Sequence, residues 1–90
     1  DEHFSHPRHN QNILIQNCVF DGITNDNRNG IFIIDGKNIK IDHCIFKNLT
    51  RKTMPGAIDI EPNGHTFSII QNIQIINNAF KNVTGGVGNI

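Results

Sequence analysis

The chain has 90 residues, and its eight Lys and Arg balance eight Asp and Glu, so the formal net charge is zero with neutral His. This balance gives no electrostatic footprint for nucleic acid or an anionic membrane, and no apolar run reaches the roughly 20 residues of a membrane span. The composition includes 17 Ile and 14 Asn but only two Ala and two Leu. Such a composition excludes a helical bundle and a disordered chain, and the length allows one small domain.

Residues 1–11 show no strand pattern, and we expect an irregular lead-in or cap there. This segment carries His3, His6 and His9 at three-residue spacing. If Asp1 is a free terminus, His3 can join the amine and two amides in a square-planar Cu2+ or Ni2+ site. His6 and His9 can add Zn2+ ligands. The alternative is that the histidines bind no metal and only line the groove of a preceding coil.

A 13-residue pattern recurs over the rest of the chain, at residues 12–24, 38–50 and 72–84. Successive copies start 26 and 34 residues apart. Each copy opens with Asn-Ile-x-Ile, whose alternation predicts a short strand with both Ile on one face. A polar pair and a second short strand ending in Phe follow. Because a copy can bury its Ile and Phe face only against the next copy, the pattern predicts a solenoid over residues 12–90.

A third strand is expected after each of the first two copies, opened by Gly30 and by Gly56. Alignment of the two segments on these glycines predicts the inward positions Phe32, Ile34, Ile58 and Ile60. It predicts the outward positions Ile33, Asp35, Asp59 and Glu61. The longer second spacing is explained by one eight-residue insertion within residues 62–71. Three strands per turn predict an all-β fold, a parallel β-helix of about three coils.

Two columns of equivalent residues are expected to run along the solenoid. Phe20, Phe46 and Phe80 should stack in the core. Cys18, Cys44 and Asn78 should share a turn, where an Asn can bond the backbone. We expect both cysteines to be free and buried, because parallel side chains do not converge, although a disulfide between adjacent coils stays open.

The combined pattern Gly-x-Ile-x-Ile and Asn-Ile-x-Ile-x-Asn-Asn/Cys-x-Phe-x-Asn resembles the right-handed parallel β-helix repeat of pectate-lyase-like proteins. That superfamily includes pectate lyases, polygalacturonases and bacteriophage tailspikes, and the resemblance covers residues 12–84. It implies a polysaccharide partner, an extracellular or virion-associated location, and a substrate lying along the Gly-x-Ile-x-Ile strands. The fold hosts lyases, hydrolases and non-catalytic shafts, so the resemblance does not choose among them.

Three acids are the candidate catalytic residues on that face. Asp59 and Glu61 lie two residues apart on one strand, so their stems are ~6.5–7 Å apart, and we expect them to act as acid and base. Asp35 should assist from the position equivalent to Glu61 on the neighbouring coil, ~4.8 Å away. The same oxygens can instead hold Ca2+, accept hydrogen bonds from a sugar without catalysis, or be ordinary solvent-facing acids.

The predicted turns and the insertion supply candidate substrate contacts. Arg51 and Lys52 can bind an anionic sugar, and His65 and Phe67 can add an imidazole and an aromatic contact. The insertion can equally be a capping flap. Loops on a rigid scaffold are where binding residues concentrate.

The next strand is due at Ile90, where the sequence stops in mid-coil. We expect a fragment of a longer solenoid, or a homo-oligomer that is a trimer or stacks end to end. Three function hypotheses follow: polysaccharide cleavage, a non-catalytic binding module or spike shaft, and a self-associating structural assembly.

Overall fold

The computed structural model describes residues 9–23, 29–53, 56–62, 68–84 and 90. Within these residues the chain forms eight strands. Their bounds are β1 (Gln11–Gln16), β2 (Val19–Asp21), β3 (Ile31–Ile33), β4 (Gly36–Asp42), β5 (Ile45–Leu49), β6 (Ile58–Ile60), β7 (Ile70–Ile76) and β8 (Ala79–Val83).

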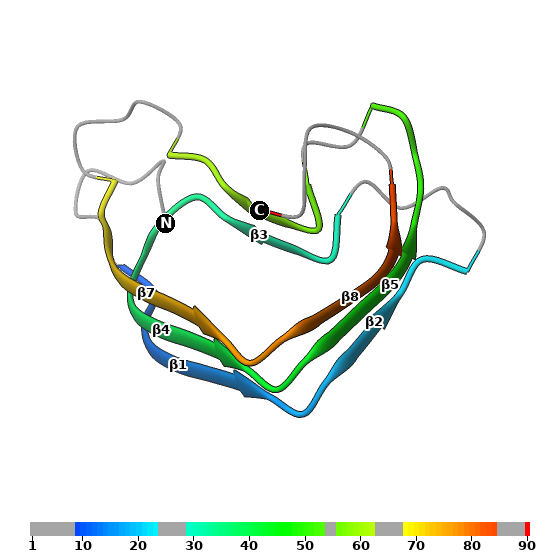
Figure 1. Ribbon diagram of the computed structural model, residues 1–90. Coiled ribbons are helices and arrows are strands. Elements are labelled where there is room, and N and C mark those ends of the chain that lie inside the picture. The colour runs from blue at the N-terminus through cyan, green and yellow to red at the C-terminus, as the bar shows by residue number, and fades with distance from the viewer. Residues whose placement is uncertain (1–8, 24–28, 54–55, 63–67, 85–89) are drawn as a thin grey trace.

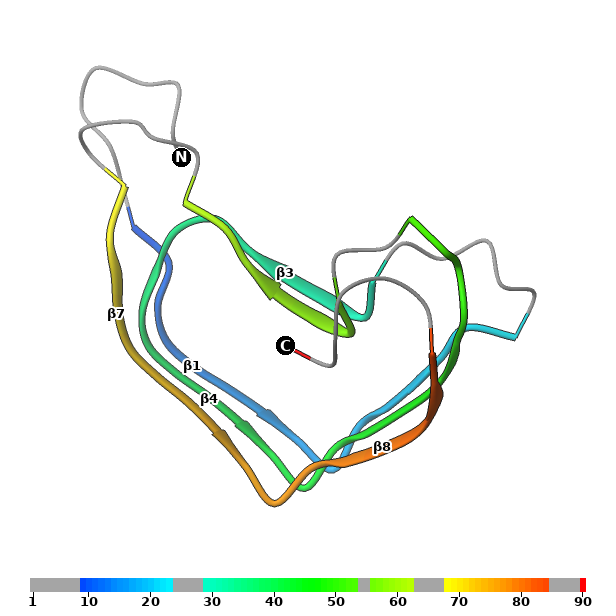
Figure 2. The ribbon, with the colours of Figure 1, turned by 45° about the horizontal axis from the view of Figure 1, so that its top comes forward.

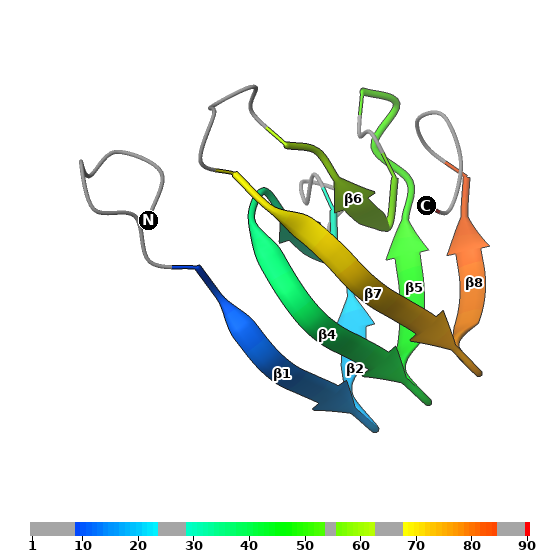
Figure 3. The same ribbon diagram turned by 90° about the vertical axis from the view of Figure 1, so that its left-hand side faces the viewer.

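The strands form three parallel sheets, ordered β1-β4-β7, β2-β5-β8 and β3-β6. We call β1–β3 coil 1, β4–β6 coil 2, and β7 with β8 coil 3. The two three-stranded sheets meet in a V, and β3 and β6 span its open side (Figures 1 and 2). In side view the strands of successive coils lie next to one another (Figure 3). This arrangement confirms the predicted parallel β-helix of about three coils.

Left-handed residues at five-residue spacing bend each coil. In coil 2 they are Asn38, His43 and Asn48, with φ of 57°, 53° and 58°. The equivalent residues are Asn12 and Asn17 in coil 1 and Asn72, Asn77 and Asn82 in coil 3. Asn tolerates this conformation better than other residues with a Cβ. In coil 2 the buried pair Ile39 and Ile41 follows the first bend, and the buried pair Cys44 and Phe46 follows the second.

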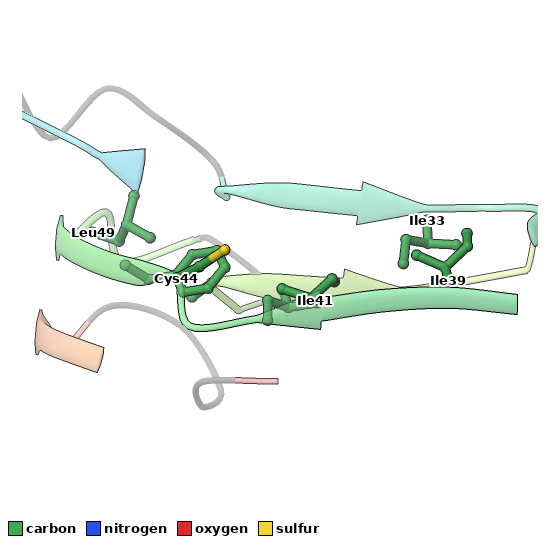
Figure 4. Packing of buried hydrophobic residues seen from close by; sticks show 8 residues of the cluster. Ile33, Ile39, Ile41, Cys44 and Leu49 are labelled. Atoms are coloured by element: carbon green, nitrogen blue, oxygen red, sulfur yellow. The ribbon is translucent and has the colours of Figure 1, made fainter. Parts of the chain in front are cut away.

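The core is centred on coil 2, which has a coil on either side. The buried hydrophobic residues of the core, shown as sticks in Figure 4, are Ile33 of coil 1 and Ile39, Ile41, Cys44, Phe46, Leu49, Ala57 and Ile58 of coil 2. The predicted aromatic column is confirmed. The Phe46 ring stacks on Phe20 with centroids 4.9 Å apart and on Phe80 at 5.3 Å, at interplanar angles of 7° and 12°.

Polar side chains form ladders that cross the coils at the bends. The Asn72 side-chain amide donates to Asn38 Oδ1 at 2.9 Å, and the Asn38 amide donates to Asn12 Oδ1 at 3.2 Å. In the second ladder the Asn82 amide donates to Asn48 Oδ1 at 3.0 Å. The ladders satisfy amides that would otherwise compete with the backbone for partners.

The cysteine column is free of disulfides, as predicted. Asn78 Oδ1 accepts a hydrogen bond from the Cys44 amide at 2.7 Å, and the Asn78 side-chain amide donates to the Ile41 carbonyl at 3.0 Å. The expectation that both thiols are buried is wrong for Cys18, which is exposed. Cys18 lies in coil 1, and in the described part of the chain no coil lies on its outer side.

The register of β3 on β6 differs by one residue from the glycine alignment. Ile31 pairs with Ile58, Phe32 with Asp59, and Ile33 with Ile60. The amides of Gly30 and Ile31 both donate to the Ala57 carbonyl, at 2.8 and 3.1 Å, so Gly30 lies beside Ala57 rather than Gly56.

This shift reverses the faces predicted for β3, because a strand alternates sides at every residue. Ile33 is buried, whereas Phe32 is 51% exposed and points outward. The physical reason is that residues 31–34 are all apolar, so no polar residue among them marks which positions face outward. For β6 the prediction was right, since Ile58 is fully buried.

Candidate functional site

The outward face of β3 and β6 brings an aromatic ring next to a carboxylate. Phe32, half exposed, is the register partner of Asp59, and parallel neighbours lie ~4.8 Å apart. The Glu61 amide donates to the Ile33 carbonyl at 2.9 Å, so the ladder continues past the end of β6. Asp59 and exposed Glu61 are therefore on one face, ~6.5–7 Å apart. We call Phe32, Asp59 and Glu61 the outward β3–β6 face.

Asp35 does not join this face, and its predicted equivalence to Glu61 is wrong. The observed register places Ile34 in line with Glu61. Asp35 lies instead in the corner before β4 and is only 7% exposed. Its Oδ1 accepts the Ile69 amide at 2.7 Å, and His9 Nδ1 lies 2.8 Å from the same oxygen.

The environment of Asp35 favours the ionised form. Burial raises the pKa of its carboxyl, but the hydrogen bonds from the Ile69 amide and the His9 ring lower it, and the net pKa is below the ordinary value of 3.8. A carboxyl held ionised is a poor general acid. Asp35 ties the segments before β1, β4 and β7 together at one corner, which is a structural role.

A second buried carboxylate, Asp42, lies at the bend between β4 and β5. His43 Nδ1 is 2.6 Å from Asp42 Oδ1, and the side-chain amides of Gln16 and Asn77 donate to Asp42 at 3.3 and 3.4 Å. Burial raises the pKa of Asp42, whereas the hydrogen bonds from Asn77, His43 and Gln16 lower it, and the net pKa lies below the ordinary value.

The Asp42–His43 pair was missed by the sequence reasoning. His43 is mostly exposed and takes the left-handed bend position that Asn17 and Asn77 take in the other coils. The signal available in the sequence was this one His in a column of Asn. The His43 ring contacts Asp42 through Nδ1 and not through Nε2.

Of the remaining predicted site residues, only His9, Arg51 and Lys52 lie in the described part of the chain. His3, His6, His65 and Phe67 lie outside the described residues. His9 contacts Asp35, as above. Arg51 and Lys52 are exposed in the turn between β5 and β6, so their binding of an anionic sugar stays a prediction. Across the described residues, no three His, Cys, Asp or Glu side chains come together as metal ligands.

An apolar hollow of about 180 Å³ opens at the coil 1 end of the solenoid. Its lining includes the inward residues Ile13 and Ile15 of β1, Ile31 and Ile33 of β3, and Ile39 of β4. Except for Ile13, these side chains belong to the core or pack against it, and Phe32 and Asp35 also line the hollow. The hollow is therefore mainly the uncovered end of the apolar interior.

The described residues contain no helix of the length and apolarity needed to cross a membrane. Comparison with known proteins gives no matching family model, no matching curated protein and no matching solved structure. The parallel β-helix therefore follows from the strand pairing of this chain itself.

Proposed function

We propose that this chain is a polysaccharide-binding β-helix module whose ligand lies along the outward β3–β6 face. The observation that carries the proposal is the half-exposed ring of Phe32 in register with Asp59. An aromatic ring offers a flat apolar surface to the C–H face of a sugar, and a carboxylate accepts hydrogen bonds from sugar hydroxyls. The resemblance of the repeat to pectate-lyase-like proteins supports the same ligand class.

The charges nearest Phe32 favour a neutral polysaccharide. Asp59 and Glu61 would repel a uronate polymer, because like charges at short range are unfavourable. The basic residues Arg51 and Lys52 lie in the turn before β6 rather than on the strand, and Arg51 already takes part in another interaction. A neutral glycan is therefore the expected ligand, and polygalacturonate is the comparison probe.

Binding is tested by affinity electrophoresis in gels containing soluble β-glucan, xylan, dextran or polygalacturonate. The variant Phe32→Ala should weaken retardation by a neutral polymer about three- to tenfold, the loss expected for one aromatic contact. Leu14→Ala is the matched control, because Leu14 is an equally exposed apolar side chain of coil 1, at 58%, on a different sheet. Equal effects of the two variants, or no retardation of the parent protein by any polymer, would contradict the proposal.

Cleavage is the second candidate function, favoured by the spacing of Asp59 and Glu61. Their separation of ~6.5–7 Å falls at the lower end of the range for inverting glycosidases, ~6.5–9.5 Å. With Asp35 held in its corner, hydrolysis would depend on these two carboxylates alone. Release of reducing ends without an unsaturated product, lost in Asp59→Asn and in Glu61→Gln, would establish a hydrolase. Binding without release would leave a binding module.

A further inference from the structure

The outer side of coil 1 exposes residues that are buried at the equivalent positions of coil 2. Ile13 is 37% exposed, whereas its register partner Ile39 is 4% exposed. Cys18 is exposed where Cys44 is buried. No described residue pairs with the outer edge of β1 or β2, and the apolar hollow opens on the same side. This end of the solenoid therefore exposes side chains at positions that coil 2 buries.

Coil 3 offers a matching surface at the opposite end. Ile39 pairs with Ile13 on one side and with Ile73 on the other. Phe46 likewise pairs with both Phe20 and Phe80. Because β1 and β7 share one register on β4, the side of β7 that no described strand pairs with can pair with β1 of another molecule in that same register.

We propose that coil 3 of one molecule stacks head to tail on coil 1 of a second copy of this chain. The stacking pairs β7 with the partner's β1 and β8 with the partner's β2. Ile73 and Phe80 would then cover the partner's Ile13 and Phe20. The strand edges that the described residues leave unpaired would complete their hydrogen bonds. Open edges generally pair with another chain in this way.

The direction of the Asn ladder fits this order of coils. Asn72 donates to Asn38, and Asn38 donates to Asn12, so every donor points from a later coil to an earlier one. By its equivalence to Asn38 Oδ1, Asn72 Oδ1 would accept a hydrogen bond from the side-chain amide of the partner's Asn12. A head-to-head contact would bring two like ends of the ladder together.

A column of charged residues on the sheet β2-β5-β8 favours a second copy of this chain as the partner that covers coil 1. Lys47 forms an ion pair with Asp21 at 3.8 Å, and Lys81 follows Lys47 in register. Within one molecule the two lysines adjoin each other. In the stack Lys81 meets the Asp21 carboxylate of the next copy, so opposite charges face each other at the junction.

A contact between two different surfaces of the same molecule does not close on itself unless the rotation returns to the start. The stack therefore grows into linear oligomers rather than stopping at a dimer. Sedimentation velocity over a concentration series should show a weight-average mass that rises steadily without a plateau at two copies. A monomer at every soluble concentration would overturn the proposal.

The direction of stacking is tested by cross-linking. Gln11 and Gln71 are exposed outward residues that both pair with Lys37, so stacking brings the Gln71 position of one copy beside Gln11 of the next. Gln11→Cys and Gln71→Cys are prepared separately in a Cys18→Ser background and treated with a short bis-maleimide. The mixture of the two variants should cross-link, whereas Gln11→Cys alone should not. Equal or preferential cross-linking of Gln11→Cys with itself would overturn the head-to-tail order.

The charge at the junction gives an independent readout. Lys81→Glu should weaken association about two- to fivefold at low ionic strength, as expected for an exposed ion pair. Lys40→Glu is the matched control, since it makes the same charge change on an outward position of the middle coil. Equal weakening by both variants would show a net-charge effect and remove the assigned register.

Discussion

At the scale of single residues, the bends of this solenoid depend on Asn in a conformation that most residues avoid. Among the described residues, eight with a Cβ have φ between 52° and 58°, and seven of these are Asn. Each Asn contributes twice where a ladder forms, since it tolerates the left-handed backbone and its side chain bonds the next coil. The composition of the chain, rich in Asn as well as Ile, therefore has a direct structural explanation.

The two contributions of Asn38 can be separated by substitution. Asn38→Ala keeps a Cβ in a left-handed position and loses the ladder, so the free energy of unfolding should fall by at least ~1–2 kcal/mol, the backbone cost alone. Asn38→Gly also loses the ladder but accepts the backbone, so it should be less damaging. Urea unfolding of both variants measures the difference. A more stable Ala variant would show that the backbone conformation is not the limiting factor.

Asp35 and Asp42 predict the acid sensitivity of the fold. Their pKa values are lowered on folding, so in acid the unfolded chain takes up protons at a higher pH than the folded chain does. The stability that they contribute is complete above the ordinary carboxyl pKa of 3.8 and is lost as the pH falls through the lowered values.

Thermal unfolding followed from pH 7 to acid should thus show a melting temperature that falls steeply below about pH 4. The double variant Asp35→Asn with Asp42→Asn should melt lower at neutral pH and lose much of this slope, because an amide does not titrate. An unchanged slope in the double variant would mean that other groups control acid unfolding.

At the scale of elements, the three stacked phenyl rings connect the coils of the second sheet. Phe46 is fully buried between its neighbours, whereas Phe20 and Phe80 are covered on one side and only half-buried. The middle ring therefore has the larger apolar area to lose.

Phe46→Ala should lower the free energy of unfolding by about 3–5 kcal/mol, the usual cost of deleting a buried phenyl ring. Phe80→Ala should cost clearly less, because the site is open on one side and can relax. Denaturant titration of the two variants measures the order. At a dilution where the chain is monomeric, equal losses would contradict this order, whereas at concentrations where copies stack the two losses should converge.

The sheets β1-β4-β7 and β2-β5-β8 could be predicted because the three copies of the 13-residue pattern agree on one register. The pairing of β3 with β6 could not, because the four apolar residues 31–34 offer two phases and the two glycines are not equivalent. The candidate site inherited this error. Asp59 and Glu61 were placed on the outward face as observed, but Phe32 was expected inward and Asp35 beside Glu61.

At the scale of the whole molecule, burial is concentrated in coil 2 while the coils on either side are half covered. In a solenoid each coil contacts only its neighbours, so stability depends on how many coil interfaces are complete. The contacts of Asp35 with His9 and Ile69 could not be predicted from the sequence, because they join three segments that become adjacent, at one corner, only after the chain coils.

The spacing between coils has one more consequence. The Asn ladder links residues 26 apart between coils 1 and 2 and 34 apart between coils 2 and 3, yet both steps keep the same strand register. One of the eight extra residues lies between β5 and β6 and the other seven lie between β6 and β7, and the register of the first sheet does not change. Foreign peptides grafted between β6 and β7 should therefore be displayed without a change in the strand register.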